Sequence, residues 1–413
     1  MSDPDGPPID AGRVIADLRE LDRRTGGPEG ARRVCWGQTW REARGFLGEL
    51  LAEIDLEPDR DEAGNVWARL PGDEDRAVAV GSHLDSVPAG GWLDGALGVM
   101  AGLGVLRAWA RSGERPPASL ALVDWADEEG ARFGRSLFGS SAFSGTLDPD
   151  AVRELRDGDG RPLPDVLAEN GLDLARVLEA GERREGLAAY LELHIEQGPV
   201  LATEGVAVAA VNGCAGVERH RFAFHGQASH AGTTPMELRR DAGLAAADAA
   251  LRIEGVARER DGVATTGVLR LEPGIPTAVA GSAELVADMR HPDAAELEAM
   301  LAEVLEIAAD AAAARECELV AEAVWRIEPL AFDPELVEEA RHACREAAGA
   351  ERELTSGALH DAAEVSRVVS AAMLFVPSLR GLSHTREEDT AEADLVAGIE
   401  AFGLLANRVL AGG

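Results

Sequence analysis

The chain has 413 residues, 46% of them hydrophobic, and its 40 basic and 74 acidic residues give a formal net charge of −34. At roughly 150 residues per domain this length predicts two or three domains, and we expect two. Every basic residue is an arginine, which excludes chemistry that needs a lysine ammonium group: a Schiff base, a pyridoxal phosphate anchor or a Walker A phosphate loop.

The acidic balance also excludes nucleic acid as a partner, because a polyanion is repelled by such a surface. Solubility or adaptation to high salt explains the charge better than attraction of metal cations does. The chain has no apolar run of the roughly 18 residues that a membrane span needs. Its first ten residues are acidic and proline-rich, unlike a secretory signal. Its four cysteines are far apart and form no CxxC pair. We therefore expect a soluble cytoplasmic protein with no membrane partner and no disulfide framework.

Four apolar segments predict an α/β domain. The first two enclose a helical stretch at 95–111, which makes a βαβ pattern. Polar residues follow the four segments, and in open α/β sheets ligands bind at the carboxyl ends of the strands. The predicted strands are 78–81, 118–125, 188–195 and 371–376.

The middle of the chain has a different pattern, βαββαβ, which is typical of a ferredoxin-like α+β domain. We place the inserted domain at 214–328, so that 1–213 and 329–413 form the two parts of the α/β domain. The acidic stretch 148–164 is expected to be a surface loop or lid. The elements predicted for the insertion are strands at 218–224, 266–271, 284–290 and 318–326 and helices at 237–259 and 294–314.

The loop after the first strand suits a metal ion. His83 can give an imidazole nitrogen, Asp94 has two oxygens that can bridge two ions, and Asp85 can hold the other ring nitrogen of His83. A solvated loop with glycine turns is the ordinary alternative for any one of these residues. It explains the whole cluster poorly.

Two adjacent carboxylates, Glu128 and Glu129, follow the second strand. One of them can bind a metal while the other takes a proton from water, although an acidic pair alone is more often a helix N-terminal charge. His194 lies at the carboxyl end of the third predicted strand and His384 follows the fourth, and a single histidine at a strand end is more often structural than ligating. Together the four clusters predict a nitrogen and oxygen ligand set for Zn, Mn, Co or Ni.

Two residues of the insertion are also candidates. His230 lies in a Gly/Thr turn and can donate a hydrogen bond to a developing oxyanion, although an ordinary turn explains it equally well. Arg290 ends a predicted strand and can hold a substrate carboxylate through two hydrogen bonds, although in a chain with forty arginines a surface role is the usual one.

Six segments of the chain resemble one known family, the amidase, hydantoinase and carbamoylase branch of the M20 metallohydrolases. The resemblance runs from about residue 12 to the end. It implies an aminopeptidase-like catalytic α/β domain with a two-metal site, an inserted lid and dimerisation domain, and a homodimer. The segments are GSHLDSVPAGGWLDGALGV, DEEGARF, ELHIEQGPVL, HAGTTPM, SGALHDA and GLSHT.

The same resemblance assigns roles to residues. Glu128 becomes the general base and Asp85 the partner of His83, while His230 reaches the active site of the other subunit and Arg290 holds the substrate carboxylate. A histidine at position 194 resembles the carbamoylase and allantoate members, because peptidase-like members usually have Asp there. The implied metal ligands are His83, Asp94 and His194 for one ion and Asp94, Glu129 and His384 for the other, and the implied pocket residues are Gln197 and Gly357 to His360.

The chain departs from the family pattern around the substrate. Thr277 stands where many relatives have an asparagine that contacts the substrate, and Leu359 replaces the glycine usual before His360. Glu218 occupies a region where allantoate-directed members tend to have Arg, and it can repel a second carboxylate or favour an amine.

The leading functional hypothesis is therefore hydrolysis of the carbamoyl amide of an N-carbamoyl-L-amino acid or a similar ureido acid. The nearest alternative is allantoate amidohydrolase or another amidase of the same branch. A remote alternative is a catalytically silent binding protein on the same fold, which would be expected to have lost ligands or the base.

Overall fold

The computed structural model describes residues 6–412, which form two compact units. Gly213–Ala331 makes the second unit, and the described residues on either side of it make the first. The expected boundaries near 214 and 328 lie beside the ends of this segment. Residues 1–5 of the N-terminal stretch that we interpreted as unlike a secretory signal lie outside the described residues.

The first unit is built on a mixed nine-stranded sheet, in which β15 and the last two residues of β8 come from the two ends of the segment Gly213–Ala331. Its strand order is β15-β8-β17-β7-β5-β6-β4-β3, and β16 pairs with β8. Strand β5 runs parallel to β6 and β7, and β17 runs parallel to β7, so the carboxyl ends of these four strands meet at one edge. The strands are β3 (Asp59–Arg60), β4 (Val66–Leu70), β5 (Glu74–His83), β6 (Ala118–Trp125), β7 (Leu187–Ile195), β8 (Ala209–Cys214), β15 (Leu330–Ala331), β16 (Glu353–Ser356) and β17 (Ala371–Val376).

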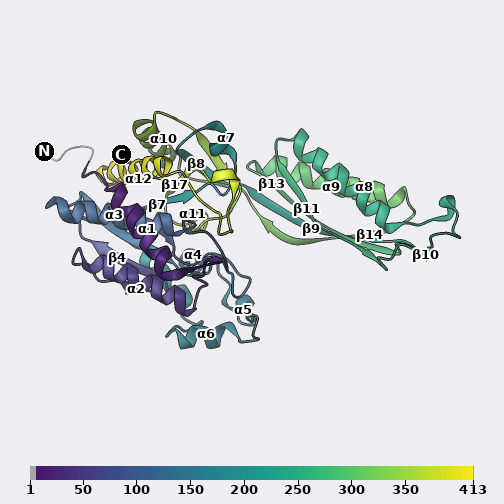
Figure 1. Ribbon diagram of the computed structural model, residues 1–413, viewed down its shortest axis with the longest axis horizontal. Helices are drawn as coiled ribbons and strands as arrows, with labels where there is room; N and C mark the ends of the chain where they lie inside the picture. The colour runs from purple at the N-terminus through teal and green to yellow at the C-terminus, as the bar shows by residue number, and fades with distance from the viewer. Residues whose placement is uncertain (1–5, 413) are drawn as a thin grey trace. The chain divides into compact units, whose positions relative to one another are not determined.

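Helices pack on this sheet according to the alternation of side chains along its strands. On β7, Leu191 and Leu193 belong to the core shared with the long helices, whereas Tyr190 faces the other way and packs against Trp125. The helix expected at 95–111 is confirmed as α3, and Gly113 ends it in a left-handed conformation. Figure 1 shows α1, in purple, beside the C-terminal helix α12, in yellow. The long helices are α1 (Ala11–Thr25), α2 (Gln38–Ala52), α3 (Ala96–Ser112), α10 (Pro334–Ala348) and α12 (Glu392–Ala411).

The shorter elements of this unit lie mostly in its connections. The stretch 148–164, expected to be a loop or lid, is partly helical: Asp148 caps α5 by accepting hydrogen bonds from the backbone N–H groups of Asp150 and Ala151, and α6 begins at Leu163. The shorter elements are β1 (Gly26–Gly27), β2 (Gly30–Ala31), α4 (Phe138–Ser144), α5 (Pro149–Val152), α6 (Leu163–Glu169), η1 (Val177–Arg184), α7 (Val200–Glu204), α11 (Asp361–Val365) and η3 (Leu379–Gly381).

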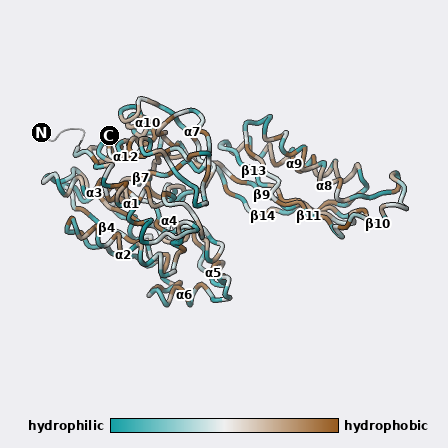
Figure 2. Tube along the Cα trace, viewed as in Figure 1, coloured by the Kyte–Doolittle hydropathy of each residue, from teal (hydrophilic) through white to brown (hydrophobic). Residues whose placement is uncertain are grey.

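The second unit has the βαββαβ order and a four-stranded antiparallel sheet, β11-β13-β9-β14. This confirms the expected ferredoxin-like fold. Phe222, Phe224 and Leu285 form its core with the two helices, along which Figure 2 shows hydrophobic and hydrophilic residues alternating. The elements are β9 (Gly216–His225), α8 (Ala242–Glu259), β11 (Val263–Glu272), β13 (Ser282–His291), α9 (Ala294–Ala313) and β14 (Glu318–Ile327), with the small strands β10 (Ser229–His230) and β12 (Ala278–Val279) and the turn η2 (Met236–Leu238).

The helix expected at 237–259 is shorter than its periodicity suggested. It begins at Ala242, because the carboxylate of Asp241 accepts a hydrogen bond from the backbone N–H of Leu244 and caps the helix there. Within residues 6–412, no helix is both long and apolar enough to cross a membrane.

Candidate metal centre

Four loops at one edge of the large sheet carry the predicted site. His83 is the last residue of β5, His194 is the penultimate residue of β7, and the other clusters follow β6 and β17. Each loop contains a non-glycine residue with a positive φ, a conformation that turns the chain sharply and that surrounding structure must hold in place. These residues are Ala89, Asp127, Gln197 and His384, with φ between 57° and 60°.

The first donor group joins His83, Asp94 and His194. The Nε2 atom of His194 lies 3.2 Å from Oδ1 of Asp94, and Nε2 of His83 lies 3.9 Å from the same oxygen. The Nδ1 atom of His194 faces the carbonyl oxygen of Ile195 at 2.9 Å, so Nδ1 carries a proton and Nε2 is the ring nitrogen turned towards Asp94. That Nε2 atom is buried without a hydrogen-bond partner.

The second donor group joins Asp94, Glu129 and His384. The Nε2 atom of His384 lies 3.3 Å from Oδ2 of Asp94 and 3.4 Å from Oε2 of Glu129. The side chain of His384 is 50% exposed, whereas those of the other two residues are buried. Asp94 thus offers one oxygen to each group, as a bridging carboxylate does.

The electrostatics of this edge fit divalent cations. Burial, and then the neighbouring Asp94, raise the pKa of Glu129 to about 7, and burial lowers the pKa of His83 to about 3, so that its imidazole is neutral. Carboxylates held this close repel one another until a cation lies between them. The buried Nε2 atom of His194 and a donor set of imidazole and carboxylate therefore fit divalent metal ions.

Asp85 orients the loop that carries the two glutamates. Its Oδ1 accepts the backbone N–H of Glu128 at 3.3 Å, and its Oδ2 accepts that of Glu129 at 3.2 Å. The Nδ1 atom of His83 lies nearer the carbonyl oxygen of Asp85, at 3.1 Å, than its carboxylate, at 3.6 Å. Asp85 therefore holds the His83 ring through its main chain and the two glutamates through its side chain.

Glu128 belongs to neither donor group, although it lies beside them. Its Oε2 is 3.7 Å from Nε2 of His83. Burial, followed by repulsion from Glu129 and Asp361, raises the pKa of Glu128 well above its usual value. A buried carboxylate next to a metal-ligand set, with an increased affinity for a proton, has the position and the basicity of a general base.

Comparison with known proteins agrees with this arrangement. A family model described as Peptidase family M20/M25/M40 matches residues 79–408. The chain belongs to this family. The family expected from the sequence motifs is therefore confirmed.

The M20 chain is similar to enzymes along almost its whole length. It is 35% identical to the N-carbamoyl-L-amino acid amidohydrolase of Geobacillus stearothermophilus, over 94% of this chain and 95% of that protein. It is 31% identical to the allantoate amidohydrolase of Bacillus subtilis (strain 168), over 90% and 91%. The crystal structure of an amidase of the hydantoinase/carbamoylase family from Burkholderia multivorans matches with a TM-score of 0.90 and 31% identity, over 98% of this chain and 99% of that one.

Three of the expected pocket residues of this M20 chain lie at the same edge. The Nε2 atom of Gln197 donates to Oδ2 of Asp94 at 3.1 Å. The ring of His360 packs edge-on against His194 at 4.5 Å between centroids. Gly357 lies in the exposed turn just after Ser356, whose hydroxyl bonds Nε2 of His360 at 2.9 Å.

The other expected substrate residues lie in the second unit. His230 pairs with Ala278, and the backbone N–H of Ala231 donates to the carbonyl of Thr277, so His230 and Thr277 lie together at the small two-stranded sheet β10-β12. The Nδ1 atom of His230 accepts the backbone N–H of Gly232, which leaves the proton of the neutral ring on Nε2, where it can be donated. Arg290 lies on β13 and donates from Nε to Asp288 at 2.8 Å.

Glu218 differs from our expectation of a residue that faces substrate. Its side chain is buried, with one oxygen 2.8 Å from Nε of Arg326 and the other 2.9 Å from Nε2 of His220. Its charge is thus compensated within the second unit.

Sequence reasoning missed several buried polar residues at the metal-centre edge. Glu192 accepts hydrogen bonds from Ser82, Tyr190 and the backbone N–H of Ala362, and so ties β5, β7 and α11 together. Glu388 bonds the loop of Asp94. Its only signal in the sequence was an acidic residue four positions after His384, among many acidic residues.

Proposed function

We propose that this M20 chain hydrolyses the carbamoyl C–N amide bond of an N-carbamoyl-L-amino acid or a related ureido acid, consuming water and releasing the amine, ammonia and carbon dioxide. The observation that carries the proposal is the position of Asp94, with Oδ1 3.2 Å from His194 and Oδ2 3.3 Å from His384. The similarity to an N-carbamoyl-L-amino acid amidohydrolase along nearly the whole chain supports this substrate class.

The two donor groups would hold two divalent ions, Zn, Mn, Co or Ni. His83, Asp94 and His194 would hold one, and Asp94, Glu129 and His384 the other. When bound, such ions supply Lewis acidity, which polarises a carbonyl oxygen and lowers the pKa of water.

Glu128 takes a proton from the attacking water and later gives it to the leaving nitrogen. Its raised pKa suits both transfers, because a more basic carboxylate accepts the proton from water more readily and keeps it until the leaving nitrogen takes it. His230 donates from Nε2 to the oxyanion that develops on the carbonyl oxygen. Arg290 holds the carboxylate of the substrate, and Gln197, His360, Gly357 and Thr277 line the pocket.

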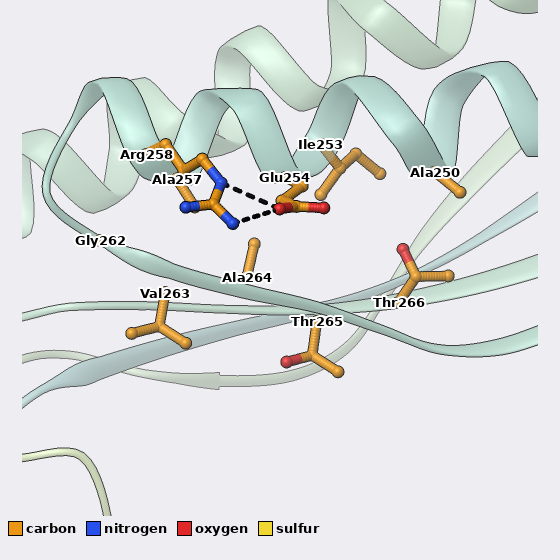
Figure 3. Close-up of a pocket in the computed structure, with 10 residues that line it drawn as sticks. All are labelled: Ala250, Ile253, Glu254, Ala257, Arg258, Gly262, Val263, Ala264, Thr265 and Thr266. Atoms are coloured by element: carbon orange, nitrogen blue, oxygen red, sulfur yellow. Dashed lines mark hydrogen bonds and ion pairs between the residues drawn. The ribbon is translucent and has the colours of Figure 1, made fainter. Parts of the chain in front are cut away.

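We further propose that the chain acts as a homodimer in which His230 completes the site of the partner subunit. The surface that supports this proposal is the edge of the second unit formed by α8 and the edge strand β11. Figure 3 shows a groove there, in which Ala264 and Thr266 of β11 point towards α8, the helix that carries Glu254 and Arg258, while Val263 and Thr265 point to the other side of the strand. Leu251 is 77% exposed and Val263 62% exposed, and an edge strand with apolar residues is a natural place for a second copy to pair.

Changing Leu251 and Val263 to Glu tests this surface by measurement of molar mass in light scattering. We expect a monomer from the double variant. The matched control is Leu178→Glu, which alters an apolar residue of the first unit that is 42% exposed and should leave the dimer intact. A double variant that stays dimeric at micromolar concentration excludes this surface.

The enzymatic proposal is tested by ammonia release from a panel of N-carbamoyl-L-amino acids, N-acyl amino acids and allantoate, with Mn, Zn, Co or Ni added. We expect the N-carbamoyl acids to be the best substrates. Allantoate as the best substrate would favour the nearest alternative, an allantoate amidohydrolase. Binding of a panel member without hydrolysis under any metal would favour the silent binding protein.

A further inference from the structure

A buried carboxylate outside both donor groups links the loops that carry Asp94 and His384. Glu388 is only 2% exposed. Its Oε1 accepts the backbone N–H of Asp94 at 3.1 Å and that of Leu93 at 3.3 Å. Its Oε2 accepts the hydroxyl of Ser383, the residue before His384, at 3.2 Å. One side chain therefore binds the bridging carboxylate's loop and the His384 loop together.

The two loops also pack closely against each other. The side chain of Glu388 lies against Gly91, where an added Cβ would be 2.0 Å from Oε1 and 2.5 Å from the Cβ of Glu388. Next to it, Nε1 of Trp92 donates to Oδ1 of Asp389 at 3.2 Å. Gly91 is thus needed for close approach, because any larger residue there would displace Glu388.

Ser383 extends the contact to the metal-binding atoms. Its hydroxyl lies 3.4 Å from Oδ2 of Asp94 and accepts a hydrogen bond from Nε2 of Gln197 at 3.1 Å. The oxygen Oδ2 is the one that Asp94 presents to His384. Glu388 therefore acts on Asp94 through the main chain and on its metal-facing oxygen through Ser383.

We propose that Glu388 is a positioning residue that fixes Asp94 against the His384 loop and thereby sets the affinity of the metal position formed by Asp94, Glu129 and His384. This inference rests on the proposed two-metal site. The partners that hold metal ligands in place are commonly needed for full metal affinity.

The other metal position depends less on Glu388. His83 and His194 are buried, and each ring is held by a main-chain carbonyl oxygen of its own loop. His384 is half exposed and lies on the loop that Glu388 holds. Losing Glu388 should therefore weaken the position that contains His384 and spare the one that contains His83 and His194.

The experiment compares Glu388→Ala and Glu388→Gln with the matched control Glu387→Ala. Glu387 is the neighbouring acidic residue, and its exposed carboxylate contacts Arg386 instead of the metal loops. The full-length metal-free protein is titrated with Mn²⁺ in a calorimeter, and bound Mn²⁺ after dialysis is measured by mass spectrometry. Circular dichroism melting confirms that each variant is folded.

We expect wild type and Glu387→Ala to hold two Mn²⁺ per chain. Glu388→Ala should hold one, because affinity at the second position falls about 10- to 100-fold. Glu388→Gln should recover most of the second ion, since its carbonyl oxygen can still accept from the loop of Asp94. Gly91→Ala should reproduce the loss without removing the carboxylate, because the added Cβ displaces Glu388.

Two results overturn the inference while leaving the proposed function standing. One is a folded Glu388→Ala variant that binds two Mn²⁺ with unchanged affinity. The other is a variant in which both positions weaken equally, which would give Glu388 a role in the whole centre. A wild-type protein that binds no Mn²⁺ would overturn the proposed two-metal site, and this inference with it.

Discussion

Replacing Glu128 with Gln separates proton transfer from metal binding. The Glu128 carboxylate belongs to neither donor group. The backbone N–H of residue 128, which donates to Asp85, is unchanged by the substitution. Gln has nearly the same shape and cannot accept the proton. We therefore expect a folded variant that retains both metal ions and turns over about 100- to 10,000-fold more slowly, the usual contribution of a general base. This corresponds to about 2.7–5.4 kcal/mol of activation free energy.

The stability of the metal-free variant gives an independent check. The pKa of Glu128 is raised in the folded chain, first by burial and then by Glu129 and Asp361. A raised carboxyl pKa means that the free energy of unfolding falls as the pH rises from the usual carboxyl range towards the raised value. The Gln variant has no carboxylate to ionise at position 128. At pH 8 the metal-free Gln variant should therefore unfold at the same temperature as wild type or higher.

The assay is ammonia release with an N-carbamoyl-L-amino acid, combined with metal analysis of the same samples. The control is Glu129→Gln, which alters the adjacent carboxylate, 3.4 Å from His384, and should reduce metal content as well as turnover. A Glu128→Gln variant that contains two ions and turns over within about threefold of wild type would refute the role of Glu128, since a general base contributes far more than that.

Three other predictions concern the substrate, the metal ions and the dimer. Arg290→Ala should raise KM about 10-fold or more for substrates with a carboxylate, the usual order of a charged hydrogen bond. Arg221→Ala, on strand β9 of the same sheet, should not, and equal KM values for both variants would contradict the role of Arg290. The pKa of His194 is lowered by burial but raised more strongly by Asp94, to about 9, and that of His384 is raised by Asp94 to about 9, so metal binding must displace protons. Calorimetry in two buffers should show proton release and affinity that rises from pH 7 to pH 9, whereas pH-independent affinity would refute it. Co-expression of His230→Ala and Glu128→Gln chains should restore about one quarter of wild-type activity, because half of random dimers pair the two variants and each then has one complete site; activity no greater than that of the separate variants would show that His230 serves its own subunit.

Much of the site could be predicted from the sequence because metal chemistry restricts the residues that take part in it. Imidazoles and carboxylates after apolar strands indicated His83, Asp94, Glu129, His194 and His384, and the structure brings them together in two donor groups. Parallel strands place such residues at one sheet edge wherever the strands lie in sequence. The βαββαβ order of the insertion could be read in the same way, since strand and helix periods differ.

Tertiary structure alone decided which polar residues support the site. Glu388 and Glu192 bond backbone N–H groups far away in sequence, at Asp94 and at Ala362, and no spacing rule predicts such contacts. The tertiary structure also directs the carboxylate of Asp85 towards the backbone N–H groups of the two glutamates. It places Arg326 beside Glu218, where the two side chains form an ion pair. The physical reason is that ligand type follows from chemistry carried by single residues, whereas burial and hydrogen-bond partners are properties of the packed chain.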